Sequence, residues 1–179
     1  MTTALDKLDT RILDLLQQDV SLSVNEIASR VASSKSVVAR RIQKLVDSGI
    51  IRKRVAVLDP QKVGLGLLVF AHIKMARHDR DVLPKFVEAV KRFPQVIECH
   101  TLMGNVDFQL KIVARDVAEY EELLWRRLSR IDGVHELHSY ISMTQFINTT
   151  RLPLEPAGMP EAVKPLRGRG SGRRGAAVR

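Results

Sequence analysis

The spacing of the apolar residues changes near residue 50, and this change divides the chain into two parts. Before it, apolar side chains recur every three or four residues, which is the spacing of amphipathic helices. After residue 65, apolar runs typical of strands alternate with two further helical stripes. A chain with both patterns is expected to be an α+β protein, in which a small helical domain precedes a domain built on a sheet.

Three short helices are predicted within residues 1–51. The first follows the apolar stripe from Leu5 to Leu16. The second begins near Val24, because Ser23 and Glu26 have the spacing of a capping box. The third follows the polar turn "ASSKS" and ends before Gly49. This order is that of a helix-turn-helix motif, and we expect a (winged) DNA-binding domain of this type.

The third predicted helix has a basic outer face and carries no acid before Asp47. An isolated helix is stabilised by Asp or Glu in its first turn, so a lysine there favours an arriving anion such as phosphate. An ordinary solvated basic face is the alternative, and the three-helix context favours DNA. The predicted DNA-binding residues are Ser34, Lys35, Ser36, Arg40, Arg41 and Lys44, with Arg52 and Arg54 bracing the phosphate backbone.

The charge of the chain is concentrated at its two ends. The net charge is +9, with 11 Lys and Arg against 7 Asp and Glu in residues 1–64 and 6 against 2 in residues 152–179. The tail also holds four of the seven prolines and five of the ten glycines, so we predict disorder from residue 152 onward. Its "RGRGSGRRG" stretch could touch nucleic acid or be an incidental solvated tail. No signal peptide or membrane span is predicted, and the single cysteine fits a reducing cytoplasm.

Residues 65–151 predict a domain with the element order βαββαβ, the ferredoxin-like pattern. Two helices on one face of an antiparallel sheet leave the other face bare, so we expect this domain to bury that face in a homodimer. A two-fold dimer would present two recognition helices to a pseudo-palindromic DNA site. The predicted domains are thus a helix-turn-helix at 1–51, a hinge strand or linker at 52–64, an effector and dimerisation domain at 65–151, and a disordered basic tail at 152–179.

Five stretches together resemble the Lrp/AsnC family, the leucine-responsive and asparagine-operon transcription regulators. They are "LDKLDTRILDLLQQD", "NEIASRV", "RRIQKLVDSGIIRK", "VIECHTLMGNVDFQLKI" and "RIDGV", and the resemblance covers about residues 5–151. It implies a helix-turn-helix, a hinge strand and a βαββαβ domain that forms dimers and often octamers or other higher oligomers. It also implies a small-molecule effector, commonly an amino acid, in clefts between dimers.

A hairpin turn at Met103–Asp107 is the predicted effector site. At a glycine, backbone N–H groups can approach a ligand carboxylate closely, and a nearby aspartate could accept a ligand ammonium. The family pattern Gly-Asp-x-Asp departs here to Gly-Asn-Val-Asp, so an amide replaces one carboxylate. A tight turn with no ligand is the alternative. The predicted set is Met103, Gly104, Asn105, Val106 and Asp107, with Ser139 and Thr144 added by the resemblance.

Neither a metal site nor a catalytic site is predicted. The five histidines and Cys99 show no zinc-ligand spacing, and no cofactor is expected. A tetrapyrrole-binding decarboxylase-like enzyme with the same fold is the alternative function, since some sirohaem decarboxylases resemble this family. The basic third helix favours a regulator that is not an enzyme.

Overall fold

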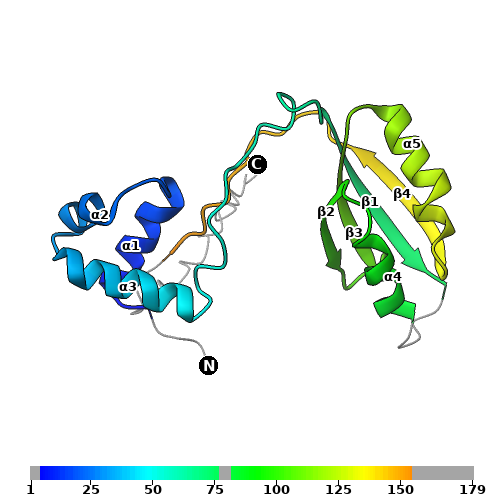
Figure 1. Ribbon diagram of the computed structural model, residues 1–179. Coiled ribbons are helices and arrows are strands. Elements are labelled where there is room, and N and C mark those ends of the chain that lie inside the picture. Colours follow the sequence, from blue (N-terminus) through cyan, green and yellow to red (C-terminus); the bar gives the residue numbers. More distant parts are fainter. Residues whose placement is uncertain (1–4, 77–81, 155–179) are drawn as a thin grey trace, which may run out of the picture. The chain divides into compact units, whose positions relative to one another are not determined.

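The computed structural model describes residues 5–76 and 82–154, which divide into two units (Figure 1). The described part of the first unit comprises residues 5–54 and 150–154. The described part of the second comprises residues 55–76 and 82–149. The α+β class expected from the change in apolar spacing is confirmed.

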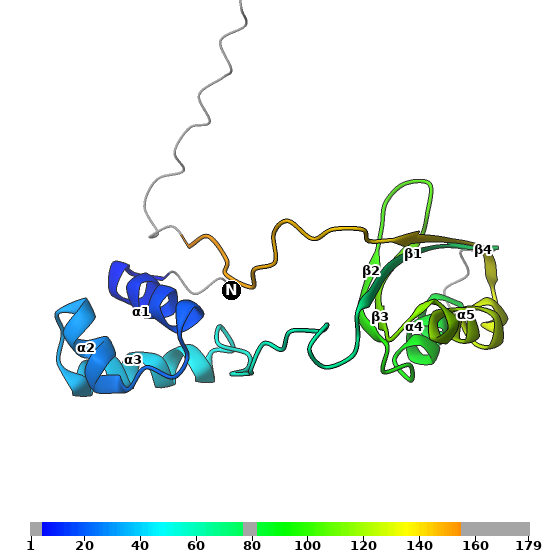
Figure 2. The ribbon, with the colours of Figure 1, turned by 90° about the horizontal axis from the view of Figure 1, so that it is seen from above.

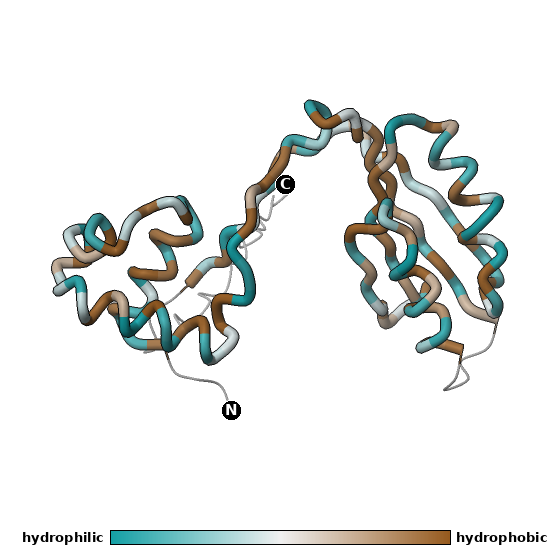
Figure 3. The backbone as a smooth tube through the Cα atoms, in the orientation of Figure 1, coloured by the Kyte–Doolittle hydropathy of each residue, from teal (hydrophilic) through white to brown (hydrophobic). Residues whose placement is uncertain are grey.

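The first unit contains three helices, α1 (Lys7–Gln18), α2 (Val24–Val31) and α3 (Lys35–Asp47). Hydrophobic and hydrophilic positions alternate along each of them (Figure 3), and their apolar faces meet in one core around Ile12, Ile27 and Val38. Each of these three side chains is at most 1% exposed. The burial of the three stripes explains why such short helices are stable together, because isolated helices of this length are marginal in water.

Helix caps fix where these elements begin. The predicted capping box at Ser23 and Glu26 is present, and a second one, which the sequence analysis did not identify, joins Asp6 and Asp9 at the start of α1. The turn between α2 and α3 passes through Ala32, which has a left-handed conformation with φ 54°. This conformation is costly for a residue with a Cβ, and it ends α2 abruptly enough for α3 to start three residues later, at Lys35.

The second unit has the predicted βαββαβ order. Its elements are β1 (Leu67–Met75), α4 (Val82–Val90), β2 (Val96–Thr101), β3 (Phe108–Ala114), α5 (Val117–Arg126), a 3-10 turn η1 (Leu128–Arg130) and β4 (Val134–Ile141). The strands form an antiparallel sheet in the order β2-β3-β1-β4. The two central strands are therefore β1 and β3, and β2 and β4 are the edges.

Both α4 and α5 lie on the same side of the sheet, as Figure 2 shows. Alternate residues of β1 and β3 are buried beneath them, and the rings of Phe86 on α4 and Phe108 on β3 lie 4.5 Å apart in this core. No helix of this unit covers the other face of the sheet within the described residues, as predicted from the element order.

Residues 52–64, predicted as a hinge strand or linker, form no strand in the single chain, where no described segment pairs with them. The last strand, β4, ends at Ile141. Its last ladder contact is the Ser142 N–H bond to the Leu68 carbonyl, and β1 offers no partner beyond that point.

The first three residues of the predicted tail, 152–154, are ordered against the helical unit. Leu154 packs against the helical core, and Arg151 pairs with Asp14 at 2.7 Å. The Leu152 N–H donates to Gln17 Oε1, also at 2.7 Å. Residues 152–154 therefore belong to the helical unit, and the prediction of disorder is wrong for these three residues. The rest of the predicted tail, residues 155–179, lies outside the described residues.

Candidate DNA-binding face and effector loop

The outer face of α3 carries most of the residues predicted to contact DNA. Val38, Ile42 and Leu45 are buried on its inner face. The opposite side chains are exposed because they lie about half a helical turn away. The exposed predicted residues are Ser34, Lys35, Ser36, Arg40 and Lys44.

The N-terminus of α3 is open to an anion. Ser34 caps the helix, since its Oγ accepts the Val37 N–H at 3.3 Å, and its hydroxyl also lies 3.2 Å from that of Ser36. The first turn contains no acidic side chain. The positive end of the helix dipole is therefore not offset by a local carboxylate, and exposed Lys35 adds to it.

Arg41 differs from its neighbours because it is engaged inside the protein. Its guanidinium bonds the Asp6 carboxylate and also lies 3.2 Å from Asp9, whose side chain is only 7% exposed. Hydrogen bonding to Asp6 raises the pKa of Arg41, and the charge of Asp9 adds to this effect. The pair fastens α3 to the first turn of α1, so Arg41 has a structural partner where a DNA contact was predicted.

A basic segment follows the helix bundle. Ile51 packs partly against the helical core, and the three residues after it, Arg52, Lys53 and Arg54, are exposed. These cations belong to the same compact unit as α3. They extend the positive charge of that unit beyond α3.

The predicted effector loop connects β2 to β3, and its tip is exposed at Met103, Gly104 and Asn105. Asp107 closes its base, because the Leu102 N–H donates to the Asp107 carbonyl at 2.9 Å. The Asp107 carboxylate accepts the Met75 N–H at 2.7 Å. This carboxylate therefore ties the loop to the end of β1, a role that the sequence pattern did not indicate.

Ser139 and Thr144 do not join this loop within one chain. Ser139 pairs in register with Ala71, in the middle of β1, and its hydroxyl lies 2.6 Å from the Tyr120 hydroxyl on α5. Thr144 is exposed beyond the end of β4. Val106 lies in the loop and is partly buried.

The open face of the sheet holds a row of polar residues that sequence reasoning missed. His100, Gln109, His72 and His138 are consecutive register partners across β2, β3, β1 and β4. His72 Nε2 lies 3.0 Å from Gln109 Oε1. The spacing of these histidines in the sequence did not indicate a cluster, and only the strand register brings them together. Within residues 5–76 and 82–154, no cluster of side chains could hold a metal ion.

No helix in the described part of the chain is long and apolar enough to cross a bilayer. Two family models match the sequence, a winged helix-turn-helix DNA-binding domain over residues 5–52 and the Lrp/AsnC ligand binding domain over residues 68–152. The glutamate uptake regulatory protein of Zymomonas mobilis is 38% identical over 154 residues, which span 86% of this chain and 93% of that protein. The chain belongs to the Lrp/AsnC family. It is therefore a DNA-binding transcriptional regulator with a small-molecule effector domain.

Other relatives of this Lrp/AsnC regulator agree. The transcriptional activator DecR of Escherichia coli is 35% identical over 151 residues, which cover 84% of this chain and 99% of that protein. An AsnC family regulator from Agrobacterium tumefaciens is 40% identical, with a TM-score of 0.80 over 83% of this chain and 97% of its own. A regulator from Neisseria meningitidis, solved with L-Met, is 33% identical. Its TM-score is 0.80, and the match covers 84% of this chain and 97% of that chain. These relatives are named as regulators rather than enzymes, so the decarboxylase alternative is set aside.

Proposed function

We propose that this regulator reads a pseudo-palindromic operator with α3 and changes its DNA affinity or assembly when an amino acid binds its second unit. The exposed basic face of α3 carries the DNA assignment: Lys35, Arg40 and Lys44 make no ion pair with any described residue. Lys35, Ser36 and Arg40 would reach base edges from the N-terminal half of the helix. The proposed phosphate contacts are Ser34, Lys44, Arg52 and Arg54. Since the regulator acts on DNA, we propose a cytoplasmic location.

The test is the affinity of a variant in which Lys35, Arg40 and Lys44 are all alanine. We expect its specific binding to double-stranded operator DNA to fall toward that for unrelated duplexes, because base contacts and phosphate contacts are lost together. The control is a second triple variant with the same net charge, in which three exposed cations of the other unit, Lys62, Lys85 and Arg126, are alanine. Equal binding by the two triple variants would exclude α3 as the recognition helix.

We propose the exposed tip of the β2–β3 loop as the amino-acid site. The relatives support this ligand class, since one was solved with L-Met and another is named for glutamate uptake. Backbone N–H groups at Gly104 would bind the ligand carboxylate, and the Asn105 amide would bind a polar group of the ligand. Asp107 would contribute mainly by holding the loop, because its carboxylate already accepts the Met75 N–H.

Calorimetric titration with the twenty amino acids tests this site. Asp107→Asn keeps an acceptor for the Met75 N–H and removes the negative charge, whereas Asp107→Ala removes both. If the aspartate holds the loop, Asp107→Asn retains most of the affinity and Asp107→Ala does not. Equal loss in both variants would mean that the charge contacts the ligand, and no binding of any amino acid would remove the proposal.

We propose a homodimer that can assemble further, up to an octamer. The sheet face opposite α4 and α5 is open (Figure 2), and Phe146 in the segment after β4 is 92% exposed in a single chain. Exposed apolar residues gathered in one segment usually mark an interface between subunits. Those at the end of β4 and after it are Tyr140, Ile141, Met143, Phe146 and Ile147.

Sedimentation of Phe146→Asp at micromolar concentration tests the interface. A charge in a buried interface is costly, so we expect this variant to dissociate at concentrations where the wild type is dimeric. Trp125→Asp is the control, because Trp125 on α5 is 66% exposed and lies on the helix side of the sheet. A wild-type protein that sediments as a folded monomer would contradict the dimer.

A further inference from the structure

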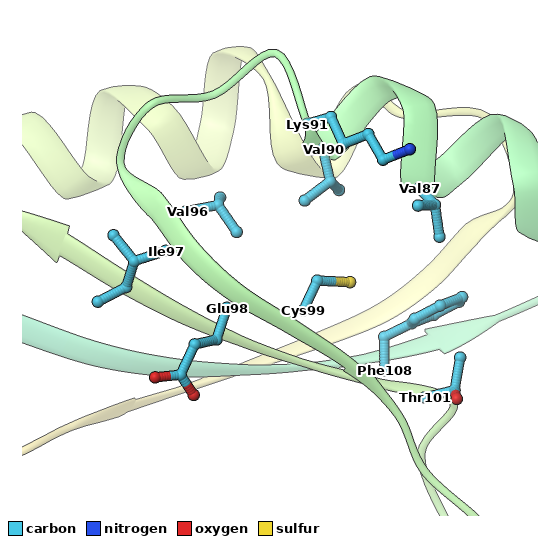
Figure 4. A pocket seen from close by; sticks show the side chains of 9 residues that line it. All are labelled: Val87, Val90, Lys91, Val96, Ile97, Glu98, Cys99, Thr101 and Phe108. Atoms are coloured by element: carbon cyan, nitrogen blue, oxygen red, sulfur yellow. The ribbon is translucent and has the colours of Figure 1, made fainter. Parts of the chain in front are cut away.

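A cavity of about 390 Å³ lies between α4 and the edge strand β2. It is outside the basic face of α3 and outside the tip of the effector loop. Cavities that bind small molecules in proteins span about 300–1,000 Å³, so this one has room for a compact ligand. Figure 4 shows the side chains that line it, which come from α4, the residue after α4, β2 and β3.

The cavity exists because α4 does not cover β2. The central strand β3 is buried at every second residue, whereas β2 is exposed from its second residue to its last. The strand register aligns Cys99 with Leu110 and Thr101 with Phe108, so the side chains of Cys99 and Thr101 lie on the helix side of the sheet. Figure 4 shows Cys99 on the side of β2 that faces α4, where it lines the cavity.

The floor of the cavity is apolar. Val90 of α4 and Phe108 of β3 are at most 2% exposed there, and Val87 and Val96 complete the wall. An apolar group of a ligand that contacts this surface leaves water, which is favourable. A ligand with a compact aliphatic or aromatic body therefore fits the floor.

One lysine and one glutamate, Lys91 and Glu98, are among the residues that line the cavity. Lys91, the residue after α4, lines it, and Figure 4 shows the Lys91 amine above Val87. Lys91 pairs with Glu88 at 2.6 Å, but both side chains are 65% exposed. Exposed pairs of this kind are weak, so the ammonium can also bind an incoming anion. The Glu98 side chain, by contrast, points away from α4 and pairs with Lys111 at 2.8 Å.

We propose that this cavity is a second small-molecule site, which binds a carboxylic acid with a compact apolar body. The body contacts Val87, Val90 and Phe108, and the carboxylate pairs with Lys91. Thr101 and Phe108 are register partners that close the base of the effector loop. An occupant of the cavity therefore touches the base of that loop, although the site does not require the DNA or amino-acid roles proposed above.

The single cysteine of the chain makes occupancy measurable. Cys99 is exposed and lines the cavity, so its alkylation, followed by intact mass, reports whether the cavity is occupied. We expect 4-methylpentanoate to protect Cys99 from iodoacetamide. At a concentration about nine times its Kd, a blocked thiol should react about tenfold more slowly. The matching amide, 4-methylpentanamide, should protect less because it lacks the charge that pairs with Lys91.

Three variants separate the parts of the site. Val87→Phe fills the cavity and should abolish protection by either compound. Lys91→Met should remove the preference for the acid over the amide, and it changes only an exposed side chain. Lys85→Met, an exposed lysine on α4 that does not line the cavity, should keep that preference.

The result that overturns the proposal is a Cys99 alkylation rate that millimolar 4-methylpentanoate does not change in the wild type. Protection that persists in Val87→Phe would also overturn it, because the compound would then act elsewhere. Alkylation that slows as the protein is concentrated, with no compound added, would mean that a second copy of the chain fills the cavity. Failure of DNA binding or of amino-acid binding at the loop leaves this measurement unaffected.

Discussion

Lys44 and Arg41 are both basic residues of α3, but the structure predicts that they affect the salt dependence of DNA binding differently. Lys44 is exposed and has no ion-pair partner among the described residues, whereas Arg41 is bonded to Asp6 and Asp9. A phosphate contact releases counterions when DNA binds, and an arginine already neutralised by two carboxylates releases few. Lys44→Ala and Arg41→Met each remove one positive charge and thus form a matched pair.

The expected magnitude follows from the number of contacts. Each phosphate contact contributes about −0.9 to the slope of log K against log salt concentration, so loss of Lys44 from both helices of a dimer reduces the slope by about 1.8. Between 50 and 200 mM salt, this change amounts to about tenfold less loss of affinity than in the wild type. Arg41→Met should leave the slope close to that of the wild type.

Fluorescence anisotropy with a labelled operator duplex at several salt concentrations measures these slopes. Lys85→Ala is the control for net charge, because Lys85 lies on α4 in the other unit. An Arg41→Met slope reduced as much as that of Lys44→Ala would refute the assignment of Arg41 to the α1–α3 contact. An unchanged slope for Lys44→Ala would refute its assignment to phosphate.

Three further predictions concern stability. Ala32→Gly relieves a left-handed alanine in the α2–α3 turn and should raise the free energy of unfolding by about 0.5–1 kcal/mol in urea titrations. Gly133 has a φ of 85°, and Gly133→Ala would place a Cβ 2.5 Å from Val82 Cγ1. This change should lower the free energy of unfolding by about 2–3 kcal/mol in the same assay. The Asp9 N–H, together with Arg41, holds the pKa of Asp6 below its usual 3.8. This lowered pKa stabilises the fold above about pH 4, and the benefit is lost as pH falls through the folded value. Thermal unfolding of Arg41→Met should therefore depend less on pH in that range than unfolding of the wild type.

Local sequence patterns were sufficient to predict the helices and the order of elements. The stripe from Leu5 to Leu16, the capping box at Ser23 and the alternating strands each depend on residues close in sequence, so their physics can be read from one segment. The same holds for the exposed face of α3, since an apolar inner face determines which residues point outward. These features placed Lys35, Arg40 and Lys44 on one surface before the fold was known.

Features that depend on distant pairs could not be predicted in this way. The partners of Arg41, Asp9 and Asp6, lie 32 and 35 positions earlier in the chain. Its position on α3, taken alone, suggested only that it lies beside the basic face. The histidine row requires the register of four strands. Leu154 was assigned to the tail because prolines and glycines follow it, although its side chain reaches a core formed by residues more than a hundred positions away. The cavity beside Cys99 likewise depends on how far α4 extends over β2.

Selection of bound sequences from random double-stranded DNA tests the central claim, that α3 reads an operator, most directly. The wild type should enrich two related half-sites whose centres are about one helical turn, roughly 10 base pairs, or a multiple of it apart. Arg40→Ala should enrich the same arrangement with relaxed preference at one base pair in each half-site, because one base contact is lost. Enrichment of an identical motif by the variant in which Lys35, Arg40 and Lys44 are all alanine, or no enrichment by the wild type, would contradict the claim.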